Sequence, residues 1–170
     1  MRTTSKSSTV DPSNSEVVFE VKKLGIVTIN GSIRDFSGEV SLPKERLAAA
    51  NFNVCLRPST VNTGNAKRDE HLRSKDFFFV TRYPKICFQS TSVAAVTNGY
   101  EVIGNLSLLE TTRKVAIPFS CKNGLFTGQL SLNRMDFKLG EKFPAFIVGK
   151  IIQLTIKCKV NQDEKTTDSI

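Results

Sequence analysis

The chain contains one histidine, His71, and it lies among charged residues where a proton-transfer site could form. Histidine side chains exchange protons near neutral pH, and Asp69, Glu70 and Asp76 are close to His71 in the sequence. A serine-type hydrolase also needs a nucleophile in contact with the base and a carboxylate that orients the base. The sequence has no nucleophile-elbow motif, and residues two apart point to different sides of a helix. We therefore expect no enzyme activity and no catalytic residue, and we interpret His71 as a polar helix residue.

The four cysteines, Cys55, Cys87, Cys121 and Cys158, are too far apart in the sequence to suggest a metal site. Zinc ribbons and thioredoxin-like sites use close CxxC pairs, and a single histidine does not complete a common set of zinc ligands. We expect no bound metal. We also expect the thiols to be reduced, as they are in cytoplasmic proteins.

The first ten residues, "MRTTSKSSTV", lack the apolar core of a secretory signal peptide. No apolar run in the chain is long enough to span a bilayer as a helix. The sequence as it stands therefore predicts a cytoplasmic protein without an integral membrane segment. A protein whose signal peptide had been removed before residue 1 would look the same, and it would be periplasmic.

The formal net charge is +8, and the sequence pI is about 9.5. This charge is compatible with an anionic partner such as nucleic acid, a membrane surface or an acidic ligand, and equally with a basic protein that has no such partner. The lysines and arginines are spread over most segments and form no run of five. Charge alone does not choose between these classes.

Apolar and polar residues alternate with a period of two along most of the chain, as in half-buried strands. Val17, Phe19 and Val21 share one face of the first such segment. The alternation covers residues 15–24, 27–42, 52–57, 85–93, 100–109, 114–121, 124–133 and 146–160. Asn98-Gly99 and Asn123-Gly124 separate consecutive segments, and Asn-Gly is a strong hairpin signal. We predict an all-β fold, an eight-stranded antiparallel barrel, with a β-sandwich as the alternative.

Helical signal is confined to two places between the predicted strands. The stretch "AKRDEHLRSKDFF", 66–78, predicts a short helix that Asn65 can cap, and "PKERLAAA", 43–50, predicts a helical turn. The polar ends, residues 1–8 and 162–170, predict a disordered N-terminal tail and a flexible C-terminal tail. The residues between these tails, 9–161, are predicted to form one barrel domain.

Leu72, Phe77 and Phe78 follow the charged part of the predicted helix directly. If this segment crosses one mouth of the barrel, the aromatic rings face the interior and the charges face water. A ligand with an apolar tail and a polar head would then have its head near Arg68 and His71. The alternative is that Phe77 and Phe78 only plug the barrel, because an eight-stranded barrel can be filled by side chains or hold one small ligand. Spacing does not separate the two. Because adjacent residues of an extended chain face opposite sides, we also expect one of the two rings, with Phe78 the less certain, to lie outside the cavity.

A nucleic-acid-binding barrel is the main rival interpretation, because small barrels bind single strands through a basic groove and exposed aromatic rings. Here most phenylalanines are in phase with the inward apolar face, as Phe19, Phe52, Phe88 and Phe119 illustrate. That pattern is typical of barrel lining rather than of stacking platforms.

The order of several motifs resembles the YceI-like family of lipocalin-like proteins. The motifs are "GSIRDFSGEV", "STVNTGNAKRDEHLRSKDFF", "YPKICFQS", "NRMDF" and "VGKIIQLTI", and the resemblance runs from about Thr9 to Val160. It implies a long antiparallel barrel whose apolar cavity holds polyisoprenoid lipids, including isoprenoid quinones. Family members are often periplasmic.

By position, Arg68, Asp69, His71, Leu72, Asp76 and Phe77 occupy the RD-x-HL block of the family and the phenylalanine that follows it. Gly31, Phe36 and Gly38 occupy a G…F-x-G block, and Asn133, Arg134, Asp136 and Phe137 occupy an NR-x-DF block. The chain departs from the family pattern at Asn14 and Lys23, where histidines are common, and at Glu110 and Lys138, where glycines are common.

Together, the pattern and the resemblance predict a protein that binds, stores or transports a polyisoprenoid or isoprenoid-quinone lipid, without nucleic acid as a partner. The alternative is a nucleic-acid or other anion-binding module. No cofactor is expected apart from the bound lipid, and the sequence also allows a homodimer. The predicted ligand-binding residues are Phe19, Ile33, Phe36, Arg68, His71, Leu72, Phe77, Phe78, Phe88, Phe119 and Arg134. Arg68 and Asp69 have the further interpretation that they tie the helix to a neighbouring loop.

Overall fold

The computed structural model describes residues 7–41, 43 and 46–161, and its regular structure is almost all strand. The strands are β1 (Ser7–Thr9), β2 (Glu16–Lys23), β3 (Val27–Ser41), β4 (Asn51–Asn62), β5 (Ile86–Val96), β6 (Gly99–Leu108), β7 (Thr111–Lys122), β8 (Leu125–Asn133) and β9 (Val148–Lys159). The helical elements are α1 (Ala66–Arg73) and the 3₁₀ turns η1 (Pro12–Asn14), η2 (Leu47–Ala49) and η3 (Arg134–Phe137).

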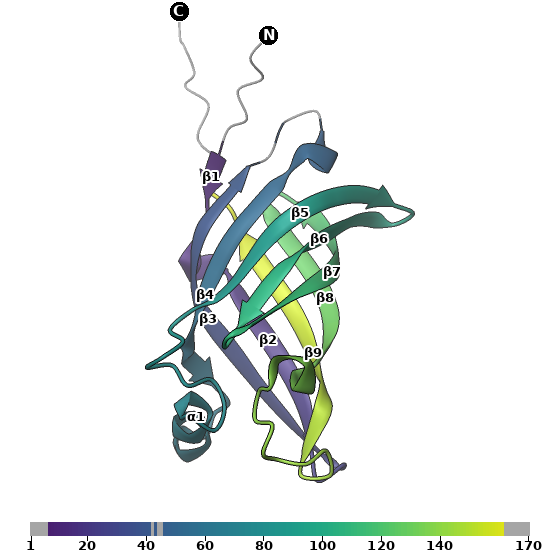
Figure 1. Ribbon diagram of the computed structural model, residues 1–170. Helices are drawn as coiled ribbons and strands as arrows, with labels where there is room; N and C mark the ends of the chain where they lie inside the picture. Colours follow the sequence, from purple (N-terminus) through teal and green to yellow (C-terminus); the bar gives the residue numbers. More distant parts are fainter. Residues whose placement is uncertain (1–6, 42, 44–45, 162–170) are drawn as a thin grey trace, which may run out of the picture.

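The eight strands β2 to β9 form a closed antiparallel barrel, as the sequence predicts. Their order around the barrel is β3-β2-β9-β8-β7-β6-β5-β4, and β4 pairs back onto β3. Figure 1 shows α1 at one end of the barrel and the short strand β1 at the other. The chain ends before residue 7 and after residue 161 lie outside the described residues, so the structure does not bear on their predicted disorder.

The ninth strand, β1, was not predicted. Ser7 and Ser8, which the sequence assigns to the N-terminal tail, pair with Ser41 and Val40 at the end of β3. A three-residue edge strand is too short to show a period of two, so only its partner strand reveals it.

Strand β3 bends sharply enough to pair with β2 along one half and with β4 along the other. Asp35 and Gly38 have positive φ angles of 61° and 119°, and the β3–β4 register shifts twice in this part of the strand. A Cβ atom on Gly38 would clash with the carbonyl oxygen of Asn53 on β4. The bend therefore needs a glycine, and it is what allows the sheet to close.

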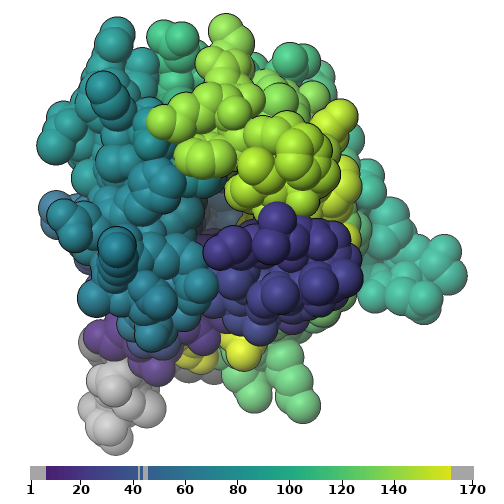
Figure 2. All heavy atoms as spheres, turned by 90° about the horizontal axis from the view of Figure 1, so that it is seen from below, coloured from purple at the N-terminus to yellow at the C-terminus, as the bar shows by residue number. Residues whose placement is uncertain are grey.

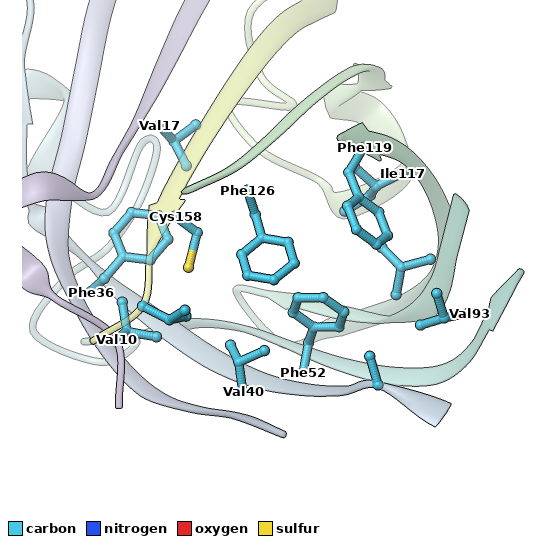
Figure 3. Packing of buried hydrophobic residues seen from close by; sticks show 13 residues of the cluster. Val10, Val17, Phe36, Val40, Phe52, Val93, Ile117, Phe119, Phe126 and Cys158 are labelled. Carbon is cyan, nitrogen blue, oxygen red and sulfur yellow. The ribbon is translucent and has the colours of Figure 1, made fainter. Parts of the chain in front are cut away.

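Three phenylalanines fill the end of the barrel near β1. Phe52, Phe119 and Phe126 are all buried, and their ring centroids lie 5.2–5.7 Å apart (Figure 3). Phe52 meets the other two rings at 73° and 90°, which is the edge-to-face arrangement that aromatic quadrupoles favour. We refer to these three residues as the aromatic plug. It closes one end of the barrel.

The predicted helix forms, and Asn65 caps it. The side-chain oxygen of Asn65 accepts a hydrogen bond from the backbone N–H of Arg68 at 2.9 Å. The second predicted helical segment contributes only the 3₁₀ turn η2 among its described residues. Within the described part of the chain, no helix has the length and apolarity needed to cross a membrane.

The expectation that all thiols are reduced is wrong for one pair. Cys55 on β4 and Cys87 on β5 form a disulfide, with their Cα atoms 4.1 Å apart. The two residues are opposite each other in the β4–β5 ladder, although 32 positions separate them in the sequence. That ladder has only four residue pairs, Asn53–Leu56 with Ile86–Gln89, so the disulfide strengthens a short seam of the barrel. Cys121 and Cys158 are free thiols.

Removing this disulfide should lower the free energy of unfolding by about 3–4 kcal/mol, because a loop of this length gains conformational entropy in the unfolded chain. The measurement is urea unfolding of the Cys55→Ser/Cys87→Ser double variant, with Cys121→Ser as the control. Adding a reductant to the wild-type protein should give the same loss. An unfolding midpoint equal to that of the wild type would show that the bond does not stabilise the fold.

Candidate functional site

The barrel encloses a cavity of about 800 Å³ whose wall is almost entirely apolar. Every strand of the barrel contributes inward side chains, and the aromatic plug forms the floor. The wall follows the cross-strand register, because Val17, Phe19 and Val21 of β2 pair with Ile156, Leu154 and Ile152 of β9. All six of these side chains line the cavity. The alternation in the sequence therefore builds a continuous apolar surface on the inside of the barrel rather than a filled core.

The mouth of the cavity is at the end opposite the plug. Three segments surround it: the β2–β3 turn at residues 23–27, α1 with the turn that follows it, and the segment 138–147 before β9. Figure 2 looks onto this end and shows a hollow between the purple, teal and yellow-green parts of the surface, which are these three segments. A ligand can enter here without unfolding the barrel.

The polar side chains that line the cavity are nearly all basic. Apart from Asn65 and three cysteines, they are Lys22, Lys23, Lys67, Arg68, His71 and Arg134. No aspartate or glutamate is among the described lining residues. The cavity wall is thus mostly apolar, and its few polar side chains are nearly all positively charged.

Asp76 links two of the three mouth segments. Its carboxylate accepts a hydrogen bond from the Nζ of Lys142 at 2.6 Å and lies 2.9 Å from the Nε2 of His71. These contacts, first with Lys142 and then with His71, hold the pKa of Asp76 below its ordinary value. The helical side of the mouth is therefore bound to the 138–147 segment by charge.

Aromatic packing reinforces the same link. The rings of Phe77 and Phe143 stack 5.1 Å apart at 7°, and His71 meets both of them edge-on at 5.3 and 5.6 Å. Lys142 lies over the ring of Phe143 at 5.3 Å. We call His71, Asp76, Phe77, Lys142 and Phe143 the clasp. The clasp accounts for the charged residues directly beside phenylalanines in the sequence, because both kinds hold the mouth together.

Phe77 and Phe78 both line the cavity. The expectation that one of the two faces away from it, as in an extended strand, is wrong. The segment is a compact turn, in which the N–H of Phe77 donates to the carbonyl of Ser74 at 3.1 Å and that of Phe78 to the carbonyl of Leu72 at 2.9 Å. Phe79, with φ of 45°, packs on Tyr83 instead. The third phenylalanine is the one outside the cavity.

Arg68 lines the mouth and also ties α1 to the loop before it. Its Nε donates to the hydroxyl of Thr63 at 2.8 Å, and one terminal nitrogen donates to the Thr63 carbonyl at 3.0 Å. The buried carboxylate of Asp69 accepts hydrogen bonds from the same threonine, at 2.9 Å from its N–H and 2.6 Å from its hydroxyl. The structure thus contains the helix-to-loop tie, and it leaves the second terminal nitrogen of Arg68 without a hydrogen bond among the described residues.

Arg134 is buried, and its guanidinium donates five hydrogen bonds to main-chain carbonyls. The acceptors are Gly149, Leu139, Gly140, Phe143 and Val148, at 2.6–3.0 Å. Three of these acceptors lie on segment 138–147, which crosses the mouth without regular structure, and the other two, Val148 and Gly149, begin β9. Because the bonds use every N–H of the group, Arg134 positions this segment, and a polar contact with a ligand would have to break one of them.

The arrangement offers little for catalysis. The imidazole ring of His71 contacts a carboxylate and two aromatic rings, and no hydroxyl or thiol is among the described partners of the ring; Ser74 Oγ donates to the His71 carbonyl instead. Burial raises the pKa of the Cys158 thiol to about 12, so the group is protonated at neutral pH. In the part of the chain that the structure describes, no cluster of three metal-ligating side chains occurs. What the geometry offers is a place for an apolar molecule.

All of the predicted ligand-binding residues lie on the wall of this one cavity, which shows their position but not that they bind. They are Phe19, Ile33, Phe36, Arg68, His71, Leu72, Phe77, Phe78, Phe88, Phe119 and Arg134. Sequence pattern does not single out Phe143 of the clasp, because Phe143 lies in a stretch without periodicity. It also missed Lys22 and Lys23, which alternation places on a strand end but not at a mouth.

Comparison with known proteins identifies the family to which this chain belongs. The model of the YceI-like domain family matches residues 9–160, nearly the whole described chain. The chain belongs to the YceI-like family. Among curated relatives, UPF0312 protein YE1254 of Yersinia enterocolitica is 39% identical over 101 residues, which are 59% of this chain and 53% of the relative. The match spans about half the length of the curated relatives.

Solved structures share the YceI-like fold at low sequence identity. BcnA of Burkholderia cenocepacia has a TM-score of 0.82 at 24% identity and covers 90% of this chain and 99% of its own. The Campylobacter jejuni YCEI protein has a TM-score of 0.72 at 21% identity, covering 84% and 90%. A polyisoprenoid binding domain from Saccharophagus degradans has a TM-score of 0.67 at 14% identity, covering 91% and 97%. At these identities the likeness is one of fold.

Replacing Arg134 by Met should lower the free energy of unfolding by about 3 kcal/mol or more, because several buried carbonyls would lose their donor at about 1–3 kcal/mol each. Lysine has three N–H donors and should restore only part of the loss. Urea unfolding measures both variants. The control is Arg113→Met, since exposed Arg113 donates a single bond, to the Asp136 carbonyl. An Arg134→Met loss within about 0.5 kcal/mol, the range of a neutral surface change, would refute the positioning role.

Asp76→Asn should destabilise the protein at neutral pH but not in acid. Since the pKa of Asp76 is lowered in the folded state, its ionised form adds stability above the unfolded value, about 3.9, and this stability is lost as the pH falls through the folded value. The difference in urea midpoint between wild type and variant should therefore shrink below about pH 4. Glu141→Gln, on the same segment but outside the clasp, is the control. A difference that stays constant from neutral pH into acid would exclude a charge-based clasp.

Proposed function

We propose that this protein binds a long apolar lipid of the polyisoprenoid or isoprenoid-quinone class in its cavity and stores or transports it. The observation that carries the proposal is the apolar cavity itself, closed by the aromatic plug at one end and open at the clasp end. Burial of each methylene contributes about 0.8 kcal/mol before the cost of ordering the chain, so a long tail gains affinity with its length.

The mouth suits the polar end of such a lipid. Quinone, hydroxyl and phosphate head groups all carry hydrogen-bond acceptors, and the lining there supplies donors from Lys67, Arg68 and His71. The fold neighbour from Saccharophagus degradans is described as a polyisoprenoid binding domain, which agrees with this ligand class. No step of binding or release requires a metal, a cofactor or a catalytic residue.

Nucleic acid is a poorer fit than lipid. Proteins that bind single strands stack bases on exposed aromatic rings. Here the rings of Phe19, Phe52, Phe119 and Phe126 are buried inside the barrel. Positive charge alone would give only weak, salt-sensitive binding.

The disulfide gives an indication of the cellular compartment. Disulfides persist in oxidising compartments and are rare where cytosolic reductants act. The Cys55–Cys87 bond therefore supports a periplasmic or other extracytoplasmic location, in place of the cytoplasmic location that the sequence alone suggests. A lipid carrier in such a compartment would move its cargo between membranes or hold it away from them.

The test is to fill the cavity without disturbing the fold. Leu130 on β8 lines the cavity, and Leu130→Trp should displace at least two methylenes of a lipid tail, which is about 1.6 kcal/mol or roughly tenfold in affinity. Binding is measured by titrating delipidated protein with a long-chain isoprenoid quinone. Native mass spectrometry of the protein as purified should show a co-purified lipid as an added mass.

The matched control is Gln129→Trp, which adds the same ring on the exposed outer face of the same strand. It should bind the quinone as the wild type does. The proposal fails if the wild-type protein does not bind the quinone, or if Leu130→Trp binds it as tightly while its unfolding midpoint is unchanged.

A further inference from the structure

Large apolar side chains are exposed around the cavity mouth. Within the described residues, Leu24, Ile26 and Val27 of the β2–β3 turn and Phe146 before β9 are exposed, with Ile26 at 82% and Phe146 at 73%. We call residues 23–27 together with Phe146 the mouth tip. Val96 and Ile151 are the other exposed large apolar residues in the described chain. Exposed apolar side chains gathered at one place indicate an interaction surface.

The two parts of the mouth tip belong to one side of the mouth. The N–H of Leu24 donates to the carbonyl of Ile147 at 3.0 Å, and Lys23 pairs with Val148 at the start of β9. Figure 2 shows the purple turn beside the yellow-green segment, both next to the hollow. Any surface that covers the mouth tip therefore also lies beside the cavity entrance.

The β2–β3 turn has an apolar residue where its backbone favours asparagine. Leu24 and Gly25 have φ angles of 53° and 71°, nearly the same as Asn123 and Gly124 in the β7–β8 turn, at 52° and 74°. Asn-Gly is the favoured pair for this turn, and a leucine with positive φ is strained. The two turns thus share a backbone conformation and differ in side chain. The one at the mouth retains a leucine despite the strain, and two further apolar residues follow it.

Basic residues flank this apolar surface. Residues 22–28, "KKLGIVT", contain two lysines and no carboxylate, and Lys150 lies close by on β9. Lys67 adds a positive charge across the mouth. On segment 138–147 Lys142 is paired with Asp76, and Glu141 is the one acidic residue there. An apolar tip with a basic surround is the combination that binds the interface of an anionic bilayer.

We propose that the mouth tip docks on an anionic lipid bilayer, with Leu24, Ile26 and Phe146 inserted among the lipids and the lysines at the phosphate level. The cavity entrance then faces the membrane, so an apolar ligand passes between bilayer and cavity without crossing water. This surface goes beyond lipid binding in the cavity, and it can be tested separately. A partner protein with an apolar groove is the competing occupant.

The absence of tryptophan from the chain makes insertion directly measurable. Ile26→Trp places a single reporter on the mouth tip, and its emission should shift to the blue and be quenched by brominated lipids in vesicles that contain phosphatidylglycerol. Val96→Trp is the matched control, because Val96 is also exposed but lies at the β5–β6 hairpin. Its emission should not change when the same vesicles are added.

Vesicle flotation then measures affinity. Wild-type protein should float with phosphatidylglycerol-containing vesicles much more than with pure phosphatidylcholine, and added salt should weaken this binding. Ile26→Asp should weaken it at least about tenfold, because a charge would enter the apolar interface. Val96→Asp should bind as the wild type does. The idea is overturned if the wild type does not float, if Ile26→Asp floats equally, or if Val96→Trp shifts as Ile26→Trp does.

Loading from detergent micelles separates this proposal from the proposed function. Ile26→Asp should take up the isoprenoid quinone from micelles as well as the wild type does, because the cavity is unchanged. Wild-type protein that loads from micelles but ignores vesicles would refute the docking surface and leave the cavity function standing. Protein that docks on vesicles but never takes up the quinone would refute the cavity function and leave the docking surface standing.

Discussion

The pairing of β3 with both β2 and β4 is the contact on which the rest of the molecule depends. Without it the sheet would have two open edges and its apolar face would be in water. The bend at Asp35 and Gly38 allows one strand to serve both neighbours, so the sheet closes and the backbone ladder is continuous around the barrel. Closure removes the inner face from water, but the inward side chains do not fill the space. The aromatic plug fills one end, and the remaining volume is a cavity.

The open end is held by side chains rather than by strands. The entrance interrupts the barrel ladder, so carbonyls of segment 138–147 and of the first two residues of β9 need other donors. Arg134 supplies five of them from a single buried guanidinium. The clasp then joins this segment to α1 through Asp76 and the stacked rings of Phe77 and Phe143. The entrance is therefore a defined frame, although most of it has no regular secondary structure.

Local pattern explains which of these features the sequence predicts. Period-two alternation identified the eight barrel strands and the inward residues such as Phe19 and Phe88, because a strand encodes its own two faces. Two hairpins, β5–β6 and β7–β8, followed from Asn-Gly pairs, which are also local signals. The Cys55–Cys87 bond could not be predicted, because it depends on the register between two strands that a helix separates. The roles of Arg134 and Phe143 depend on chain folding within a segment that has no period. Phe78 was misjudged as a candidate to face outward because a turn was taken for extended chain.

The charge pattern shows the same limit. The lysines and arginines are scattered in the sequence, so a net charge of +8 agrees equally with a nucleic-acid, membrane or lipid partner. Folding brings several of them to one end, where the lining carries no described acidic group and the neighbouring turn exposes Leu24 and Ile26. The opposite end has the same turn conformation with Asn123 and Gly124 and an aromatic plug beneath it. The two ends of the barrel therefore differ in chemistry as well as in structure, and two turns of the same backbone conformation contribute to that difference through their side chains alone.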